Sequence, residues 1–233
     1  EIFSGFCNFT GILALCMKNS IEIPIIVSSF DDRQACWPAW CHGFQKYLSD
    51  WNGPLLFLSN FIKSPCGHAM LTGQEKRWPF MIKSALNFFP ASIVIMTLED
   101  FWITRKVNCQ EILEYVQLIE HNIVDYIRLY PNPYPDHPFT EDSRLGILDT
   151  EAYFRASTQM SLWRKDILLD LICDSETIWE FEERGTERSR KYGGRFLSVN
   201  DLSYGVNYVH AVEQGTWTPG AYKYAEIEGI TID

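Results

Sequence analysis

The chain has 233 residues and a formal net charge of −10, from 30 acidic and 20 basic residues. Hydrophobic residues make up 46% and charged residues 21%, a composition that excludes extended disorder and low-complexity repeats. The negative charge disfavours nucleic acid as a partner, because proteins that bind a phosphate backbone are usually basic. A nucleotide held through a divalent cation remains compatible with this charge, since the metal would supply the positive charge.

The predicted elements of the first half alternate between strand and helix. The strands are predicted at 23–29, 55–59, 92–98 and 125–130, and the helices at 37–48, at 78–89 and from Asn108 onward. The first strand is a continuous β-branched run, which is typical of a strand buried on both faces. Asn108 with Glu111 three residues later is a capping-box pattern. The alternation predicts an α/β domain with a mostly parallel mixed sheet of about six to eight strands.

The second half has weaker periodicity. Four prolines fall within 131–138, which predicts a loop leaving the sheet. After it we expect a strand at 153–162, helices at 164–173 and 178–191, and a short strand at 208–212. No internal repeat divides the chain, so both halves are assigned to a single domain.

Seven cysteines are present, an odd number without a Cys-x-x-Cys spacing. We interpret them as free thiols in a reducing compartment, with Cys36 and Cys41 as buried helix residues and not as zinc ligands. The apolar stretch 9–17 is shorter than the ~20 residues of a membrane span, so neither a transmembrane segment nor a clean signal peptide is predicted. These observations favour a cytoplasmic protein, with a peripheral position at a membrane as the alternative.

Polar side chains follow three of the predicted strands, where parallel sheets bind ligands. They are Ser28, Phe30 and Asp32 with their neighbours after the first strand, Asn60 after the second, and Glu99 and Asp100 after the third. Two adjacent carboxylates leaving a buried strand must face a crevice, because an ionised group in a dry core is costly. A hard divalent cation that bridges carboxylate and diphosphate oxygens would compensate them. A solvated turn or a helix start is the alternative interpretation.

A second acidic segment is Trp179-Glu180-Phe181-Glu182-Glu183. A carboxylate among aromatic rings can have a raised pKa and act as a general base. Alternatively, these acids open a helix, with Glu180 and Arg184 as a stabilising pair four residues apart. Which glutamate faces the crevice is left open. His210 follows the apolar pair Tyr208-Val209 and is a candidate to complete a metal site.

Several common motifs are missing from the sequence. It contains no Gly-x-Gly-x-x-Gly after the first strand, no Walker-type Gly-Lys-Ser/Thr and no Gly-x-Ser-x-Gly. These absences disfavour dinucleotide oxidoreductases, P-loop NTPases and serine hydrolases.

The chain resembles GT-A-type nucleotide-sugar glycosyltransferases, specifically bacterial and phage-like members associated with surface-polysaccharide synthesis. The resemblance covers about Ile23 to Trp217. It rests on the segments 25–31, 98–101, 126–133, 161–164 and 179–182. The pair Glu99-Asp100 stands where the family has an Asp-x-Asp motif, and this departure puts metal dependence in question.

The resemblance implies a GT-A (Rossmann-like) fold in one domain, flanked by helices. It implies an N-terminal extension at 1–22, a nucleotide-sugar-binding half at 23–130 and an acceptor-side half at 131–233. The implied donor is a UDP- or GDP-sugar, the acceptor a glycan or lipid-linked glycan, and the cofactor Mn²⁺ or Mg²⁺. The implied role is in polysaccharide biosynthesis.

The resemblance also implies roles for individual residues. Glu99, Asp100 and His210 would hold the cation; Ser28, Phe30, Asp32 and Asn60 would hold the nucleoside; Glu180 or Glu182 would be the base of an inverting transfer. Gln159, Trp163 and Tyr153 are expected sugar contacts, because amides and aromatic faces suit sugars. Two other function classes remain as alternatives: a non-catalytic carbohydrate- or nucleotide-binding module, and a metal-dependent nucleotidyltransferase or phosphohydrolase.

Overall fold

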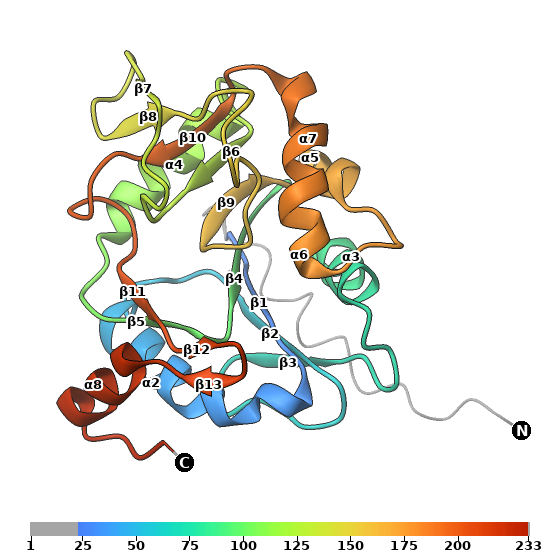
Figure 1. The fold of residues 1–233 in the computed structure, drawn as a ribbon, viewed down its shortest axis with the longest axis vertical. Helices are drawn as coiled ribbons and strands as arrows, with labels where there is room; N and C mark the ends of the chain where they lie inside the picture. Colours follow the sequence, from blue (N-terminus) through green and yellow to red (C-terminus); the bar gives the residue numbers. More distant parts are fainter. Residues whose placement is uncertain (1–22, 233) are drawn as a thin grey trace, which may run out of the picture.

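A computed structural model describes residues 23–232, and within them a mixed nine-stranded sheet forms the centre of the molecule (Figure 1). The strand order is β3-β2-β1-β4-β9-β6-β10-β8-β7. The strands are β1 (Ile25–Ser28), β2 (Leu55–Ser59), β3 (His68–Leu71), β4 (Ile93–Leu98), β6 (Tyr126–Arg128), β7 (His137–Pro138), β8 (Leu145–Ile147), β9 (Ser161–Arg164) and β10 (Phe196–Val199). The expected mixed α/β sheet is confirmed.

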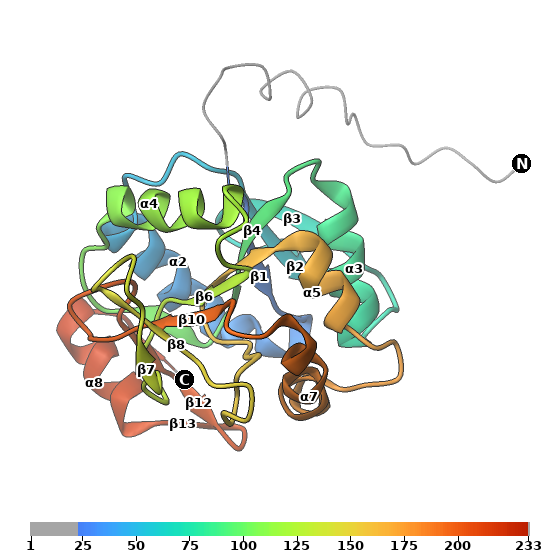
Figure 2. The same cartoon turned by 90° about the horizontal axis from the view of Figure 1, so that it is seen from above.

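Helices cover both faces of this sheet (Figure 2). One face carries α2 (Trp37–Tyr47), α4 (Cys109–Glu120) and α8 (Pro219–Glu228). The other carries α3 (Trp78–Phe88), α5 (Lys165–Leu171) and a helical segment over 178–192. This last segment contains α6 (Ile178–Glu180), a π-helical stretch (Phe181–Gly185), α7 (Thr186–Ser189) and a final 3-10 turn. The molecule therefore has the three layers expected of a doubly covered sheet.

The two hydrophobic cores follow from the alternation of side chains along each strand. In β1, Ile25 and Val27 pack with the α2 and α4 face, whereas Ile26 packs with the α3 and α5 face. In β4, Ile95 and Val94 divide between the two cores in the same way. Strands buried on both faces read as continuous apolar runs, which is why the sequence predicts them well.

The directions of the strands determine where their carboxyl ends lie in the sheet. β1 pairs in parallel with both β2 and β4, and β2 pairs in parallel with β3. β9 lies between β4 and β6 and is antiparallel to both. β4 and β6 consequently run in the same direction, as expected for residues 23–130, although a strand from the second half separates them.

The second half departs most from expectation. The strand expected at 153–162 is instead a loop that ends in β9, because its backbone turns around the buried Arg155. The sequence analysis also missed several short strands and one helix: β3, β5 (Phe101–Ile103), β7, β8, β10, the hairpin of β12 (Val212–Glu213) with β13 (Thr216–Trp217), and α8. The strand expected at 208–212 is β11 (Tyr208–His210), which pairs with β5.

The capping pattern at α4 is half correct. The Asn108 side chain accepts a hydrogen bond from the Glu111 backbone N–H, as expected of an N-cap. The Glu111 carboxylate does not return to the cap but accepts from the Gly205 backbone N–H at 2.9 Å. Gly205 has a φ of +74°, and a Cβ there would clash with the Leu129 carbonyl, so glycine is required at this contact.

The cysteine prediction needs correction at Cys41. Cys41 on α2 forms a disulfide with Cys66, with the two Cα atoms 5.9 Å apart. The fold brings together two residues 25 positions apart, which no local spacing could indicate. Cys36, Cys109 and Cys173 are free thiols, whereas Cys7 and Cys16 lie outside the described residues. Because disulfides persist in oxidising environments, this pair removes the main argument for a reducing, cytoplasmic compartment.

The N-terminal extension predicted at 1–22 also lies outside the described residues. Across 23–232, none of the helices combines the length and the apolar character needed to cross a bilayer.

Candidate active site

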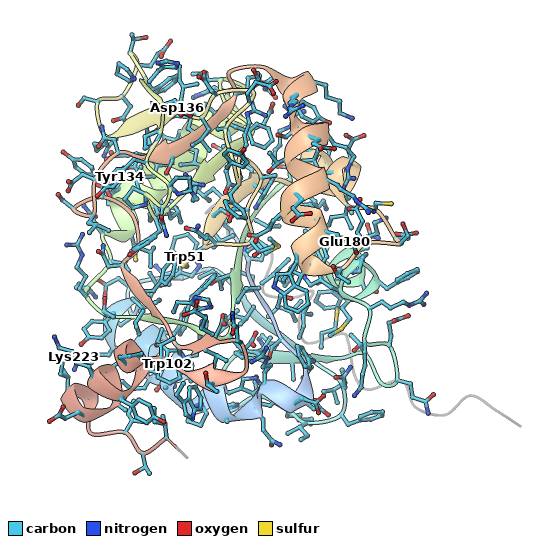
Figure 3. All side chains as sticks on the ribbon, in the orientation of Figure 1. Trp51, Trp102, Tyr134, Asp136, Glu180 and Lys223 are labelled. Atoms are coloured by element: carbon cyan, nitrogen blue, oxygen red, sulfur yellow. A yellow bond between two sulfur atoms is a disulfide. The ribbon has the colours of Figure 1, made fainter. Side chains whose placement is uncertain are left out.

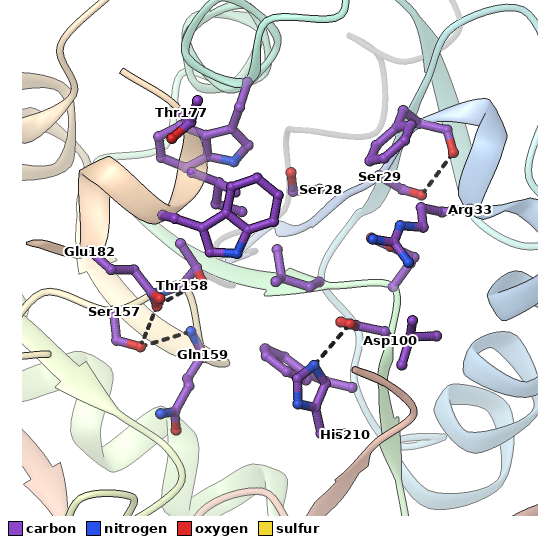
Figure 4. A pocket seen from close by; sticks show the side chains of 18 of the residues that line it. Ser28, Ser29, Arg33, Asp100, Ser157, Thr158, Gln159, Thr177, Glu182 and His210 are labelled. Carbon is purple, nitrogen blue, oxygen red and sulfur yellow. Dashed lines mark hydrogen bonds and ion pairs between the residues drawn. The ribbon is translucent and has the colours of Figure 1, made fainter. Parts of the chain in front are cut away.

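A cavity of about 1500 Å³ opens beyond the carboxyl ends of β1 and β4. One wall carries Ser29, Arg33, Asp100 and His210, and the facing wall carries Thr177, Glu182 and the loop 157–159 (Figure 4). The first wall comes mainly from the strand ends of the first half, and the second from the second half of the chain. The cavity therefore lies where parallel sheets place their ligands.

The acid pair of the first wall occupies the turn between β4 and β5. Glu99 and Asp100 are 6% and 9% exposed. β5 begins directly after them and pairs with β11, which sets His210 opposite Phe101 in the register. As a result, His210 Nε2 lies 3.1 Å from Asp100 Oδ2. The two candidate ligands Asp100 and His210 are adjacent, although 110 residues separate them in sequence.

Charge is poorly compensated at this turn. Glu99 Oε1 lies 3.8 Å from Arg33 Nε. Burial, together with the charge of Asp100, raises the pKa of Glu99 above its usual value. The hydrogen bond with Asp100 raises the pKa of His210. The two carboxylates and His210 therefore lie close together at a buried turn, where a cation would offset the repulsion between Glu99 and Asp100.

The donor atoms at Asp100 fit a hard cation. Asp100 Oδ1 is buried and has no hydrogen-bond partner among the described residues, and His210 supplies a nitrogen beside it. Within residues 23–232, no three His, Cys, Asp or Glu side chains are grouped closely enough to hold a metal by themselves. A cation held here would take its remaining ligands from phosphate oxygens and water, as Mg²⁺ and Mn²⁺ commonly do.

Glu182 is the central acid of the facing wall. Its helix starts at Thr177, where Thr177 and Glu180 form a reciprocal capping box, and Phe181 is fully buried beneath it. Glu182 Oε1 accepts three hydrogen bonds: from Ser157 Oγ at 2.9 Å, from Thr158 N at 2.7 Å and from Thr158 Oγ1 at 2.8 Å. Because all three end on Oε1, the other oxygen is left to accept a proton.

The loop that holds Glu182 is itself fixed by a buried arginine. Arg155 is fully buried and donates to Ser189 Oγ at 2.7 Å and to the carbonyls of Ser189 and Leu148. The Ala156 backbone N–H donates to Thr186 Oγ1 at 3.1 Å. These bonds attach the loop to the 178–192 helix, so Ser157 and Thr158 reach Glu182. No sequence motif indicated Arg155, because only the fold brings Leu148 and Ser189 to its side chain.

Glu180 does not line the cavity, although it is close in sequence to Glu182. Its Oε2 accepts from Thr177 N and Oγ1, and its Oε1 lies 3.4 Å from Arg184. Figure 3 labels it on the helix. Hydrogen bonding from Thr177 lowers the pKa of Glu180, which makes it a weaker base. Its observed contacts are those of a helix cap, the alternative left open by the sequence.

Two of the four expected nucleoside contacts line the cavity, namely Ser28 and Phe30. Asp32 lies outside it with its side chain 72% exposed, 3.8 Å from Lys76. Asn60 is buried, and its amide donates to Thr72 Oγ1 at 3.2 Å and to the Glu75 carbonyl at 2.9 Å. The expectation of ligand contact at Asp32 and Asn60 is not supported by their positions.

Asn60 instead supports the β1 loop together with Asp31, one of the polar residues that the sequence places after the first strand. The Asp31 carboxylate accepts from the backbone N–H groups of Asn60, Phe61 and Ile62, and Asn60 Oδ1 accepts from Asp31 N. Although desolvation opposes it, these backbone hydrogen bonds lower the pKa of Asp31. The two loops that follow β1 and β2 are thereby joined at the cavity rim.

The three residues expected to contact a sugar differ in their position relative to the cavity. Tyr153 is 85% exposed at the cavity. Gln159 lines the cavity, but its amide is occupied: Oε1 accepts from Tyr208 OH at 3.1 Å and Nε2 donates to the Asn132 carbonyl at 2.5 Å. Trp163 is fully buried in the core, with its ring 4.2 Å from that of Tyr126, so the expected contact of Trp163 with a sugar is wrong.

Several cavity residues were not anticipated. Three of them are basic: Arg33, Lys76 and Arg77. Others form an aromatic stack, in which the Tyr208 ring lies 4.5 Å from Phe101 and 4.4 Å from Tyr130. The adjacent Lys76-Arg77 was visible in the sequence as a basic pair just before the helix predicted at 78–89. The aromatic stack could not be seen in the sequence, because it depends on the pairing of β5 with β11.

Comparison with known proteins identifies the fold. No family model matches the sequence, and no curated protein matches it significantly. Among solved structures, it is similar to the mannosyltransferase PcManGT from Pyrobaculum calidifontis in complex with GDP-Man and Mn²⁺, with a TM-score of 0.53 and 10% identity over 83% of this chain. It is also similar to TarS 1–349 of S. aureus in complex with UDP-GlcNAc, with a TM-score of 0.52 and 11% identity over 89% of this chain.

A further structure, TarS 1–349 in complex with UDP, gives a TM-score of 0.53 with 11% identity over 78% of this chain. The chain spans 58%, 65% and 59% of these three structures, about six tenths of their length. At such low identity the similarity establishes the fold alone. The chain has the GT-A-type fold that these glycosyltransferases have.

Proposed function

We propose that this chain, which has the GT-A-type fold, transfers a sugar from a nucleoside-diphosphate-sugar donor to a hydroxyl group of a glycan acceptor. One observation carries the proposal: two separate carboxylate sites, Asp100 with His210 and Glu182, face one cavity from opposite walls (Figure 4). Sugar transfer needs two such sites, one for the leaving diphosphate and one for the attacking hydroxyl.

The Asp100 wall would bind the donor. Ser28 and Phe30 lie where the nucleoside would enter, beside the strand end that leads to Asp100. A divalent cation held by Asp100 and His210 would neutralise the charge that develops on the leaving diphosphate. Arg33, 3.8 Å from Glu99, adds positive charge on this side of the cavity. The proposed enzyme is therefore metal-dependent, with Mn²⁺ or Mg²⁺ as the cation.

The Glu182 wall would bind the acceptor. Glu182 Oε2 would take the proton of the acceptor hydroxyl while the hydroxyl oxygen bonds to the anomeric carbon and the bond to the diphosphate oxygen breaks. Ser157 and Thr158 hold the carboxylate by Oε1, so its orientation is set before the substrate arrives. A single displacement of this kind inverts the anomeric configuration. Glu182, not Glu180, is the proposed base.

The products released from a donor would test the proposed reaction. The protein is incubated with UDP-GlcNAc or GDP-mannose and Mn²⁺, and the nucleotides are separated by ion-exchange chromatography. Transfer to water or to an acceptor yields a nucleoside diphosphate and a free or linked sugar. We expect UDP or GDP, with release lost in Asp100→Asn. Formation of UMP or GMP with a sugar phosphate would indicate a phosphohydrolase, and binding without turnover would indicate a non-catalytic module.

A further inference from the structure

We infer that the wall around Glu182 is a subsite for an uncharged oligosaccharide acceptor, with Trp179 and Tyr153 as its stacking surfaces. The inference rests on the proposed function and adds to it the charge class of the acceptor and the side chains that recognise it.

Aromatic side chains without partners mark this wall. Trp179, Tyr153 and Phe154 are 71%, 85% and 47% exposed, and all three line the cavity. Across residues 23–232, none of the three side chains has a ring contact or a hydrogen bond with another residue. Large exposed aromatic rings at a cavity indicate a binding surface, because leaving them in water is unfavourable. Their flat faces match the C–H faces of pyranose rings, while the sugar hydroxyls remain solvated.

The position of Trp179 relative to Glu182 is fixed by the helix. The two residues are three positions apart and both line the cavity, as expected of one helix face. The capping box at Thr177 sets the start of the helix, and the buried Phe181 sets its rotation, with its ring 4.9 Å from Trp78. A sugar stacked on Trp179 would therefore lie within about one helical turn of the carboxylate.

The second surface is also held in place. Arg128, fully buried at the end of β6, donates to the Phe154 carbonyl at 3.1 Å and to the Pro133 carbonyl. The next residue, Arg155, is anchored by its own hydrogen bonds to Leu148 and Ser189, as described above. The backbone that follows Tyr153 is thus fixed, and the Tyr153 side chain is exposed to the cavity. Pre-formed surfaces of this kind reduce the entropy lost on binding.

The charge of this wall selects against anionic acceptors. The basic side chains of the cavity, Arg33, Lys76 and Arg77, come from the first half of the chain, and His210 lies on the Asp100 wall. Arg77 adjoins Trp78, whose ring packs 4.9 Å from Phe181 of the Glu182 helix, but its guanidinium is already engaged by the Glu75 carboxylate. Between positions 130 and 182 the described lining includes no Lys, Arg or His. A uronic acid or a phosphate bound there would find no unpaired basic side chain and would lie near Glu182. Uncharged sugars avoid this repulsion.

The other acids of this wall do not change the conclusion. Asp174 pairs with Lys83 at 2.5 Å, and Glu176 pairs with Arg188 at 2.5 Å. Both cations are already engaged, so neither provides a free site for an anionic acceptor. Glu182 is held only by neutral donors.

Saturation-transfer NMR tests the inference without requiring turnover. The protein, with UDP or GDP and Mg²⁺, is presented with uncharged tetrasaccharides built on glucose, galactose, mannose or N-acetylglucosamine, and with oligogalacturonate as the anionic probe. At least one uncharged probe is expected to bind and oligogalacturonate is not. Trp179→Ala is expected to weaken binding about tenfold or more. Tyr134→Ala is the matched control, because Tyr134 is 61% exposed and lies away from this helix (Figure 3).

The outcomes separate the inference from the function on which it rests. Preference for oligogalacturonate, no binding of any uncharged probe, or equal effects of Trp179→Ala and Tyr134→Ala would overturn the inference. If these results occur while the protein still releases UDP or GDP from a donor, the transferase proposal survives. If an uncharged saccharide binds through Trp179 but no donor is turned over, the subsite survives and the proposed catalysis fails.

Discussion

At the scale of single residues, the unequal use of the two Glu182 oxygens leads to a sharp prediction. Glu182→Gln keeps an acceptor oxygen for Ser157 and Thr158 but removes the base. We expect turnover of the donor to fall by about 10²–10⁴-fold, the usual range for loss of a general base. Nucleotide binding, measured by titration calorimetry, should be unchanged because Glu182 lies on the wall facing Asp100. Glu183→Gln, at an exposed neighbouring position, is the control and should retain full activity.

A second residue-scale prediction concerns the contact between Tyr208 and Gln159. Tyr208→Phe keeps the ring stack with Phe101 but leaves Gln159 Oε1 without its donor. Loss of one such hydrogen bond corresponds to about 0.5–1.5 kcal/mol, so we expect turnover to fall by roughly 2- to 10-fold.

Steady-state kinetics with a UDP- or GDP-sugar measures the effect of Tyr208→Phe. Tyr130→Phe is the matched control, because the Tyr130 ring belongs to the same stack while its hydroxyl has no hydrogen bond within residues 23–232. Equal kinetics for the two variants would show that the bond to Gln159 has no positioning role.

Residues at strand ends were predictable when the chemistry was local. Asp100 could be found because two acids cannot stay uncompensated after a buried strand. Asn60 has the same kind of position, but its amide is used by Thr72 and Glu75, which the sequence does not place nearby. Trp163 was expected to contact a sugar but is buried in the core, where an aromatic residue in a strand is more often found.

At the scale of elements, the attachment of α8 to α2 predicts a pH-dependent stability. Glu228 near the end of α8 accepts from Lys46 and Tyr47 and lies 2.7 Å from His42 Nε2. Burial opposes the shift, but these hydrogen bonds lower the pKa of Glu228 to about 2. Because the pKa is lower in the folded state, the stabilisation is present above about pH 4.5 and is lost as the pH falls toward 2.

Glu228→Gln tests this attachment. We expect its Tm at pH 7 to be lower than that of the wild type by roughly 2–4 °C, and the difference to shrink as the pH is lowered from about 4.5 toward 2. Calorimetric melting at several pH values gives the comparison. A difference that does not change with pH over this range would mean that the charge of Glu228 does not stabilise α8.

The Cys41–Cys66 disulfide gives a second prediction at this scale. It joins α2 to the segment before β3, and a closed loop of this size stabilises the folded state by about 3–4 kcal/mol in the chain-entropy treatment. Cys41→Ser with Cys66→Ser should lower the free energy of unfolding by that order, measured by urea denaturation under oxidising conditions. Cys173→Ser, which removes an exposed free thiol, should have no effect. A double variant as stable as the wild type would contradict the disulfide.

Elements with strong local patterns were predictable and short ones were not. The amphipathic α2 and α4 and the apolar β4 agree with the sequence within a few residues. β8 and β10 have three and four residues, and their pairing is decided by the fold. α8 had a readable signal that the sequence analysis did not use: Thr218 is the N-cap, Pro219 opens the first turn and Gly229 closes the helix with a φ of +66°.

At the scale of the whole molecule, the antiparallel β9 is what brings the two halves together. It lies between β4, which leads to Asp100, and β6, which leads to the proline-rich loop. The loop before β9 carries Ser157, Thr158 and Gln159 into the cavity from the side opposite Asp100 (Figure 4). The sequence predicted both acidic sites but not that they face each other, because that depends on this one strand.

The measurement that tests the account most directly is calorimetric titration of UDP and of GDP into the protein, with Mn²⁺ and with EDTA. We predict that one of the two nucleotides binds at least about tenfold more tightly with Mn²⁺, a difference of ~1.4 kcal/mol. This enhancement should disappear in Asp100→Asn and persist in Asp32→Asn, whose carboxylate lies outside the cavity. Failure of both nucleotides to bind under any of these conditions would contradict the proposed transferase.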